Sequence, residues 1–297
     1  MTSDRLKQLW DDLRRHDSHV WRRAVDAGVT HGPDALVRYS PPVFGVAFAA
    51  ALARQRRAVR DNLRRALGPR PALHELRDVA AVFANYASSL TDAFVAGSER
   101  GDPLRVRCHD ERPIEDALRD GRGMILATAH TGGWQVAGLQ LQSLHGVDLV
   151  VVMRPERDAR AQEITDRKRA RAGVKIAHLG EDPLAVLSLL GHLRKGGVVA
   201  MQMDRLPQGM RGRKSELFGE PFFVPEGPLR LAAASGAPIV PVFTRRLGYM
   251  EYDVRVAPPV RLPRKPTTAD LDHAARAVLR EMEEFVRENP TQWFHFE

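Results

Sequence analysis

The pattern that most constrains the fold begins near residue 104, where short apolar runs start to alternate with segments of helical periodicity. The apolar runs predict strands at 124–128, 148–153, 175–178, 198–203, 239–244 and 252–256. The other segments predict helices at about 133–144, 157–172, 183–194, 227–235 and 268–288. Because parallel strands need long crossovers, usually helices, this alternation favours a largely parallel central sheet flanked by helices. We therefore expect an α/β core over residues 104–297.

Residues 1–103 have a different pattern, which predicts an N-terminal helical extension. Apolar residues recur at helical spacing in 6–13 and again in 76–94. Pro41 and Pro42 predict a break just before the apolar run 43–53, which leads into an arginine-rich segment over 54–65. An apolar helix beside arginines is typical of one that lies on an anionic membrane surface. A core helix with a solvated basic end is the alternative interpretation.

The net charge and the residue composition limit the kinds of partner that this protein can bind. The 297 residues carry a formal net charge of +8, which suits an anionic membrane, an acidic carrier protein or nucleic acid. Nucleic acid is the least favoured of the three, because only 6% of the residues are aromatic and no basic–aromatic motif occurs. Cys108 is the only cysteine, which excludes an internal disulfide and a cysteine zinc site. No apolar run approaches the ~20 residues of a membrane span, so we expect no transmembrane helix and no signal peptide.

Polar side chains follow three of the predicted strands. His130, Arg154 and Asp204 each come just after a strand, and the carboxyl ends of parallel strands are where ligands gather in such sheets. His130 lies between a buried strand and a glycine-rich start of a helix, a good position for a general base. A hydrogen-bonded loop histidine without a chemical role is the alternative.

The residues around His130 resemble a known signature. The run from His130 to Gln135, HTGGWQ, is similar to the His-(x)4-Glu/Asp motif of glycerolipid and lipid A acyltransferases. Further blocks of the lipid A late acyltransferase family follow in order, at 154–155, 167–173, 195–205, 217–221, 224–227, 233–241 and 284–293. The run Arg57-x-x-Arg60-x-Asn62-Leu63 matches as well, so the resemblance covers about residues 20–297.

The resemblance implies a glycerolipid acyltransferase-like fold and an O-acyltransferase. Such an enzyme moves a fatty acyl group from a thioester of acyl carrier protein or coenzyme A to a hydroxyl of a membrane lipid, with no bound cofactor or metal. His130 would take the hydroxyl proton, and backbone N–H groups of Thr131, Gly132 and Gly133 would hold the developing oxyanion. The acyl chain would lie near residues 1–103, and anionic lipid would be a partner. A peripheral position at the cytoplasmic face of a bacterial inner membrane is expected.

The main departure from the family pattern is Gln135, where the family has a carboxylate. An amide oxygen can accept a hydrogen bond from the imidazole, but it supplies no charge. Three interpretations stay open: Gln135 orients His130; a carboxylate such as Asp204 or Glu226 takes its place; or the protein binds lipid without turnover. A second departure is Leu206, since the family often has an acidic residue two positions after Asp204.

Four further residues are candidates for substrate binding. Arg154 and Arg169 suit a phosphate or sugar of the acceptor, because guanidinium forms bidentate contacts, although solvated surface arginine is the alternative. Glu226 and Gly227 belong to a Pro-Glu-Gly turn like the acceptor-binding turn of glycerolipid acyltransferases. A first-turn carboxylate favoured by the helix dipole is the alternative for Glu226. The histidines show no metal-ligand spacing.

Two other functions compete with lipid A acylation. The changes at Gln135 and Leu206 favour an acyltransferase with another acceptor, such as a glycolipid or a secondary metabolite. A protein of a different class, a catalytically degenerate lipid-binding homologue, is the second alternative. Acyl-chain length, donor, acceptor and oligomeric state are not expected to be readable from these patterns.

Overall fold

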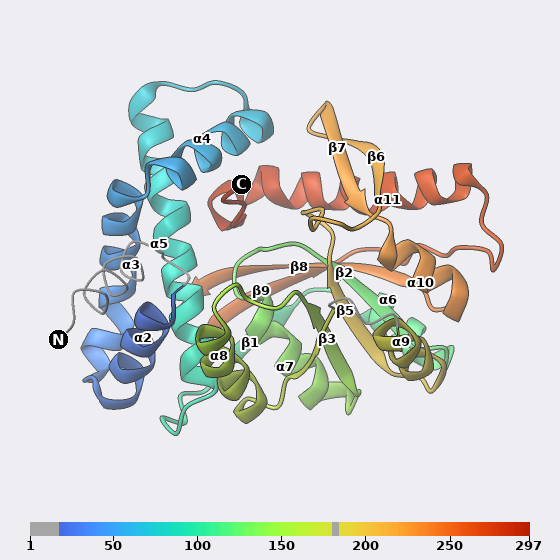
Figure 1. Ribbon diagram of the computed structural model, residues 1–297, viewed down its shortest axis with the longest axis horizontal. Helices are drawn as coiled ribbons and strands as arrows, with labels where there is room; N and C mark the ends of the chain where they lie inside the picture. The colour runs from blue at the N-terminus through green and yellow to red at the C-terminus, as the bar shows by residue number, and fades with distance from the viewer. Residues whose placement is uncertain (1–17, 180–183) are drawn as a thin grey trace, which may run out of the picture.

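The computed structural model describes residues 18–179 and 184–297 (Figure 1). Its N-terminal part is helical, as predicted, although the pattern at 6–13 lies outside the described residues. The helices are α2 (His19–His31), α3 (Asp34–Ala51), α4 (Ala53–Leu67) and α5 (Ala72–Ala96). They stand together at one end of the sheet, on the left of Figure 1.

The remainder forms a seven-stranded sheet with the order β1-β9-β8-β2-β5-β3-β4. The strands are β1 (Arg105–Cys108), β2 (Met124–Thr128), β3 (Leu149–Met153), β4 (Lys175–His178), β5 (Val198–Gln202), β8 (Ile239–Gly248) and β9 (Glu251–Val256). Neighbours from β8 to β4 are parallel, while β8 and β9 are antiparallel. The predicted α/β class with a largely parallel sheet is confirmed. A two-stranded hairpin, β6 (Gly212–Leu217) and β7 (Glu220–Pro225), was not predicted.

Helices cover both faces of the sheet. They are α6 (Arg112–Arg119), α7 (Trp134–His145), α8 (Ala159–Arg171), α9 (Leu184–Arg194), α10 (Gly227–Ser235) and α11 (Thr268–Glu288), followed by the short 3₁₀ helix η1 (Pro290–Gln292). Strand β2 is buried on both sides, since Ile125 packs with α9, α10 and α11 while its neighbour Leu126 packs with α6 and α7. Successive side chains of a strand point to opposite faces of the sheet, so Ile125 and Leu126 pack against different helices. Because both faces are covered, every residue of β2 is buried, which explains its continuous apolar run.

The break predicted at Pro41 and Pro42 was wrong. Both prolines lie inside α3, and the chain bends by 100° later, at Leu52 between α3 and α4. Proline removes a helical hydrogen bond, but here burial of Pro41 and close packing of Gly45 against the backbone of Phe83 in α5 hold the helix together.

Contacts from α5 tie the helical region to the core. Asp92 is 1% exposed and accepts hydrogen bonds from the guanidinium of Arg246 at 2.7 Å and the hydroxyl of Tyr252 at 2.6 Å. A buried carboxylate is stable only when it is paired in this way. By length and composition α5 is also apolar enough to cross a membrane, but half of the relevant window is buried inside the protein. Its packing is that of a core helix.

Candidate active site

Strand register brings His130 and Asp204 together. Strands β2 and β5 are parallel neighbours, with Thr128 opposite Gln202 at their carboxyl ends. His130 and Asp204 each follow the end of their strand by two residues, so their side chains lie at the same level of adjacent strands. A backbone hydrogen bond from Met203 N to Thr128 O, 2.8 Å long, keeps the strands paired to that point.

The two side chains form a hydrogen-bonded pair. His130 Nδ1 lies 2.8 Å from Asp204 Oδ1, and the backbone N of His130 donates to Oδ2 at 3.1 Å. Asp204 is fully buried, whereas the His130 side chain is 27% exposed. Burial alone would raise the pKa of the Asp204 carboxyl, but the facing imidazole of His130, together with Arg205 and His295, outweighs burial and holds that pKa well below its usual range. Since Nδ1 is held, Nε2 is the ring nitrogen left for chemistry, and no residue within 18–179 or 184–297 hydrogen-bonds to it.

The C-terminal segment completes the surroundings of Asp204. The indole Nε1 of Trp293 donates to Asp204 Oδ2 at 3.1 Å, and Phe294 N donates to His130 O at 2.7 Å. The ring of His295 stacks on Trp293, with centroids 5.0 Å apart. Sequence reasoning noted the ending 284–293 but missed the role of Trp293. A buried tryptophan needs a partner for its N–H, yet only the fold shows which one it has.

Behind Trp293, the segment is held by the helical region. The side-chain nitrogen of Asn62 in α4 lies 2.9 Å from Nδ1 of His295 and donates to the His295 carbonyl at 2.9 Å. Burial lowers the pKa of His295 to about 4, and the nearby Asp204 charge only partly opposes that shift. Asn62 belongs to the N-terminal run that matched the family, so this match has a structural explanation.

The side chain of Gln135 does not contact the imidazole of His130 in the way that an orienting residue would. It lies in the first turn of α7, and its side chain makes no hydrogen bond to His130 or to any other residue in the described part of the chain. Asp204 instead occupies the position beside Nδ1. Of the three interpretations of Gln135, the geometry fits the one in which a carboxylate from another strand end takes its place.

The Thr131-Gly132-Gly133 turn is packed against the protein itself. Thr131 is fully buried and its Oγ1 accepts from Thr244 N at 3.2 Å. A Cβ on Gly132 would lie 2.1 Å from Oε1 of Gln292, and one on Gly133 would lie 1.8 Å from the ring of Tyr252. Glycine is therefore required at both positions by neighbouring residues of the protein itself. Within the turn, Thr131 N donates to the carbonyl of Ala129 at 2.7 Å, and Trp134 N donates to that of Thr131 at 3.3 Å.

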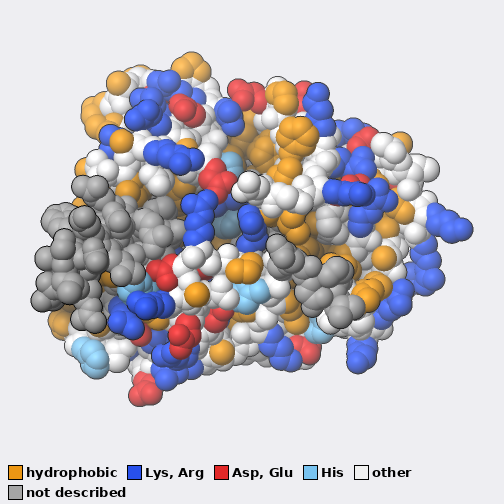
Figure 2. Space-filling model, viewed as in Figure 1, with side chains coloured by type: hydrophobic (Ala, Val, Ile, Leu, Met, Phe, Trp, Pro, Cys, Tyr) orange, Lys and Arg blue, Asp and Glu red, His pale blue; other side chains and the backbone are white. Residues whose placement is uncertain are grey.

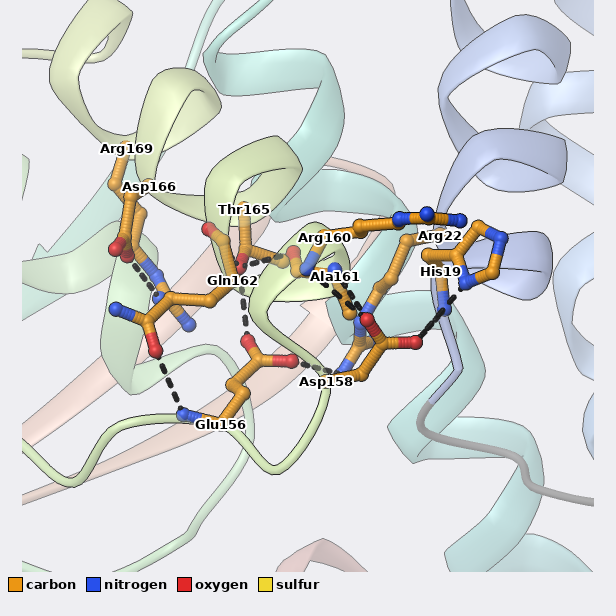
Figure 3. Close-up of polar contacts among 10 residues, drawn as sticks. All are labelled: His19, Arg22, Glu156, Asp158, Arg160, Ala161, Gln162, Thr165, Asp166 and Arg169. Carbon is orange, nitrogen blue, oxygen red and sulfur yellow. Dashed lines mark hydrogen bonds and ion pairs between the residues drawn. The ribbon is translucent and has the colours of Figure 1, made fainter. Parts of the chain in front are cut away.

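The two candidate arginines differ in availability. Arg154 follows β3 and is exposed, and no ion pair holds it within the described ranges. The Arg169 side chain is 12% exposed and pairs with Asp166 at 2.9 Å, inside a polar network between α8 and α2 (Figure 3). Burial lowers the pKa of Arg169, and Glu156 and Asp166 oppose that effect. Arg169 is thus engaged in structure, while Arg154 is free to meet a ligand.

Glu226 is also engaged, at the start of α10. Its carboxylate accepts from Arg213 and lies 2.8 Å from both Arg213 and Arg230. The hydrogen bond from Arg213 lowers the pKa of Glu226 although burial opposes it. Gly227 opens α10, and a Cβ there would meet nothing within 4 Å. The structure does not join this turn to His130 by any contact between described residues.

A small apolar cavity lies between the sheet and helices α6 and α7. Its volume is about 80 Å³, and it is lined by Leu126, Thr128, Trp134 and Leu141 among others. Trp134 connects it with the site, since its ring centroid is 6.4 Å from that of His130. No group of three or more metal-binding side chains occurs within the part of the chain that the structure describes.

Comparison with known proteins identifies the family. The model of the bacterial lipid A biosynthesis acyltransferase family matches residues 27–297, so this chain belongs to that family. A phosphatidylinositol mannoside acyltransferase of Mycobacterium tuberculosis (strain ATCC 25618 / H37Rv) is 34% identical over 131 residues, 43% of this chain and 40% of that protein. The protein of the same name from Mycolicibacterium smegmatis (strain ATCC 700084 / mc(2)155) is 28% identical over 190 residues, 62% of this chain and 61% of that protein.

The chain therefore spans less than two thirds of the length of these relatives. Among solved structures, the 1-acyl-sn-glycerophosphate (LPA) acyltransferase PlsC from Thermotoga maritima aligns with a TM-score of 0.36 and 12% identity. That alignment covers 82% of this chain and 95% of the Thermotoga chain.

Proposed function

We propose that this protein transfers a fatty acyl group from an acyl thioester to a hydroxyl of a membrane glycolipid, with His130 as the general base. The observation that carries the proposal is the pair of His130 and buried Asp204. In the neutral imidazole a carboxylate 2.8 Å from Nδ1 favours the tautomer with the proton on Nδ1, which keeps the lone pair of Nε2 available for the substrate. This tautomer is the one that a general base requires.

The reaction needs one proton shuttle and no covalent enzyme intermediate. Nε2 of His130 takes the hydroxyl proton while the alcohol oxygen attacks the thioester carbonyl carbon, which forms the new C–O bond. The C–S bond then breaks, and the imidazolium returns the proton to the leaving thiolate. Asp204 stabilises the imidazolium between these steps, because it stays charged and buried beside it. A base placed in this way contributes about 10²–10⁴-fold to the rate.

Other groups support the charges that develop. The N-terminus of α7 lies beside His130, and its first-turn N–H groups suit the oxyanion of the tetrahedral intermediate. Arg154 suits a phosphate of the donor or the acceptor, because it is exposed at the end of β3, the strand next to β5. The cavity lined by Leu126, Trp134 and Leu141 suits the start of the donor chain, since it is apolar and one of its lining rings, Trp134, packs edge-on against His130.

The acceptor class follows from two considerations. The relatives carry the name phosphatidylinositol mannoside acyltransferase, which indicates a sugar hydroxyl on an anionic lipid. A formal net charge of +8 suits both an anionic membrane and an acidic donor such as acyl carrier protein or coenzyme A. We place the protein at a membrane surface, where such an acceptor is found.

A transfer assay with a panel of substrates tests this proposal. The purified protein is incubated with acyl-coenzyme A or acyl carrier protein thioester and with vesicles that contain mannosylated phosphatidylinositol, lyso-phosphatidic acid or neither. Mass spectrometry is expected to detect one added acyl ester on the glycolipid. If every lipid stays unchanged while thioester and vesicles are both bound, the proposal fails and a lipid-binding homologue without turnover is the better description.

A further inference from the structure

A second apolar cavity lies within the helical region, away from His130. Its volume is about 290 Å³, and α2, α3 and α5 enclose it. From α2, the side chains of Trp21 and Val25 and the backbone of Gly28 line it at helical spacing, so one face of this helix points into the cavity. For comparison, an engineered apolar cavity of ~150 Å³ stays dry and takes up benzene. A space of this size and character suits a hydrocarbon group.

The cavity reaches the surface through α3. Leu36 and Phe44 of α3 line it and are nevertheless 46% and 56% exposed. Together with Tyr39, Val43 and Val46, they form an apolar face of α3 that is turned away from the protein, with exposures of 47–72%. The opposite face of the same helix is buried at Val37, Pro41, Gly45 and Ala49. A helix that is apolar on both its buried and its exposed side is unusual in water, and it indicates contact with an apolar medium.

Basic side chains stand next to this face. After the 100° bend at Leu52, α4 presents Arg54 and Arg57, both exposed and without an ion pair in the described part of the structure. Figure 2 shows basic and hydrophobic side chains intermingled at the end of the molecule that α4 and the adjoining end of α3 occupy. An apolar helix face beside unpaired arginines matches the boundary between acyl chains and anionic headgroups.

We infer that the helical cavity binds one hydrocarbon chain of an anionic membrane lipid, which enters from the bilayer across α3. The inference rests on the proposed function for its membrane setting. A lipid chain fits better than the acyl chain of the donor, because the C-terminal segment separates the cavity from the reacting atoms. Phe296 closes the cavity on one side and packs on Tyr86 at 5.1 Å, while Trp293, three residues earlier, faces Asp204.

Trp21 serves as the reporter for the experiment. It lines the cavity and packs edge-on against Phe48 at 4.9 Å. Vesicles of phosphatidylglycerol with brominated chains are mixed with the full chain, since bromine quenches tryptophan emission only on close contact. The difference between wild type and Trp21→Phe isolates the Trp21 signal. Brominated vesicles are expected to quench most of that signal, whereas unbrominated vesicles leave it unchanged. Absence of quenching in vesicle-bound wild type overturns the inference.

Filling the cavity distinguishes a chain inside it from contact at the surface. Gly28→Leu places a side chain in the cavity, where a Cβ meets nothing within 4 Å, and leucine also favours the helix over glycine. This variant is expected to sediment with vesicles like wild type but to lose the quenching of Trp21. Gly191→Leu, at another helical glycine with open space around its Cβ, is the matched control and keeps the quenching. Quenching that persists in Gly28→Leu contradicts the inference.

A separate experiment tests whether the hydrocarbon chain in the cavity comes from a membrane lipid or from the acyl donor. Brominated acyl-coenzyme A without vesicles is expected to leave Trp21 emission unchanged; quenching by this soluble donor overturns the assignment to membrane lipid. None of these measurements requires turnover. A protein that shows Trp21 quenching but no acyl transfer therefore supports the cavity assignment and refutes the proposed function. A protein that transfers acyl groups but shows no Trp21 quenching supports the proposed function and refutes the cavity assignment.

Discussion

Replacing Asp204 by asparagine changes one atom and removes the charge from the centre of the site. Oδ1 of Asp204 faces His130 Nδ1 at 2.8 Å, while Oδ2 accepts from His130 N and from Trp293 Nε1, both at 3.1 Å. An asparagine has one oxygen and one NH₂ group for these three contacts. If the oxygen takes the Oδ2 position, the two N–H donors are satisfied. The NH₂ group then donates to Nδ1, which moves the imidazole proton to Nε2 and prevents it from acting as a base.

The other orientation of the amide keeps the active tautomer at a high energetic cost. The amide oxygen then accepts from Nδ1, but the NH₂ group faces the N–H groups of His130 and Trp293 inside a fully buried position. Two unsatisfied buried donors cost about 2–6 kcal/mol, at about 1–3 kcal/mol each. The variant therefore prefers the inactive tautomer, and it also lacks the charge that stabilises the imidazolium. We expect kcat to fall by about 10³–10⁴-fold, comparable to the loss in the trypsin-type triad.

Thiol release from acyl-coenzyme A in the presence of the acceptor measures this effect. KM for the donor is expected to change little, because Asp204 is fully buried and cannot touch the substrate. Asp92→Asn is the matched control, since Asp92 is an equally buried carboxylate with several donors but lies in α5. A kcat for Asp204→Asn within tenfold of wild type refutes the reasoning. Gln135→Glu completes the test: because Nδ1 is already paired, kcat is expected to stay within about threefold, which is less than about 1 kcal/mol of activation free energy.

Three further predictions concern the surroundings of the site. Trp293→Phe removes one donor to the Asp204 carboxylate, and kcat is expected to fall by about 10-fold or more, since such a bond contributes about 1.5–3 kcal/mol. Asp92→Ala leaves the largely buried Arg246 unpaired, so urea denaturation is expected to show a loss of about 3–5 kcal/mol, against at most about 1 kcal/mol for the exposed pair lost in Arg65→Ala. Burial lowers the pKa of His295 to about 4, below the ~6.5 of the unfolded chain, so stability is expected to decline by roughly 3 kcal/mol between about pH 6.5 and 4. His295→Gln removes that decline.

The parallel core was predictable because its strands are buried on both faces. Runs such as Ile125–Leu126 and Val198–Val199 are apolar throughout, and the helices between them have clear periodicity. Two of the missed strands, β1 and β6, lack these signals. Strand β1 is an edge strand with arginine at alternate positions, and β6 carries mostly polar residues, so neither shows an apolar run. In α3, tertiary packing overrode the local signal of two prolines.

The site was only partly predictable. Polar residues at strand ends indicated His130 and Asp204, but the order of strands decides which ends are neighbours, and β5 inserts between β2 and β3 against the chain order. The contact from Trp293 bridges 89 positions, which no local pattern indicates. Gly132 and Gly133 were not fully predictable for a related reason: glycine marks a close approach, but the sequence does not say whether a ligand or the protein approaches.

A single-turnover measurement tests most directly whether His130 is the base for acyl transfer. The protein, in excess over radiolabelled acyl thioester, is mixed with vesicles that contain the acceptor glycolipid, and labelled lipid is followed with time. Wild type is expected to transfer the label, and His130→Ala to do so at least about 10²-fold more slowly. His109→Ala, at a histidine whose side chain is 76% exposed, is expected to match wild type. Labelled lipid formed by His130→Ala at the wild-type rate would contradict the account.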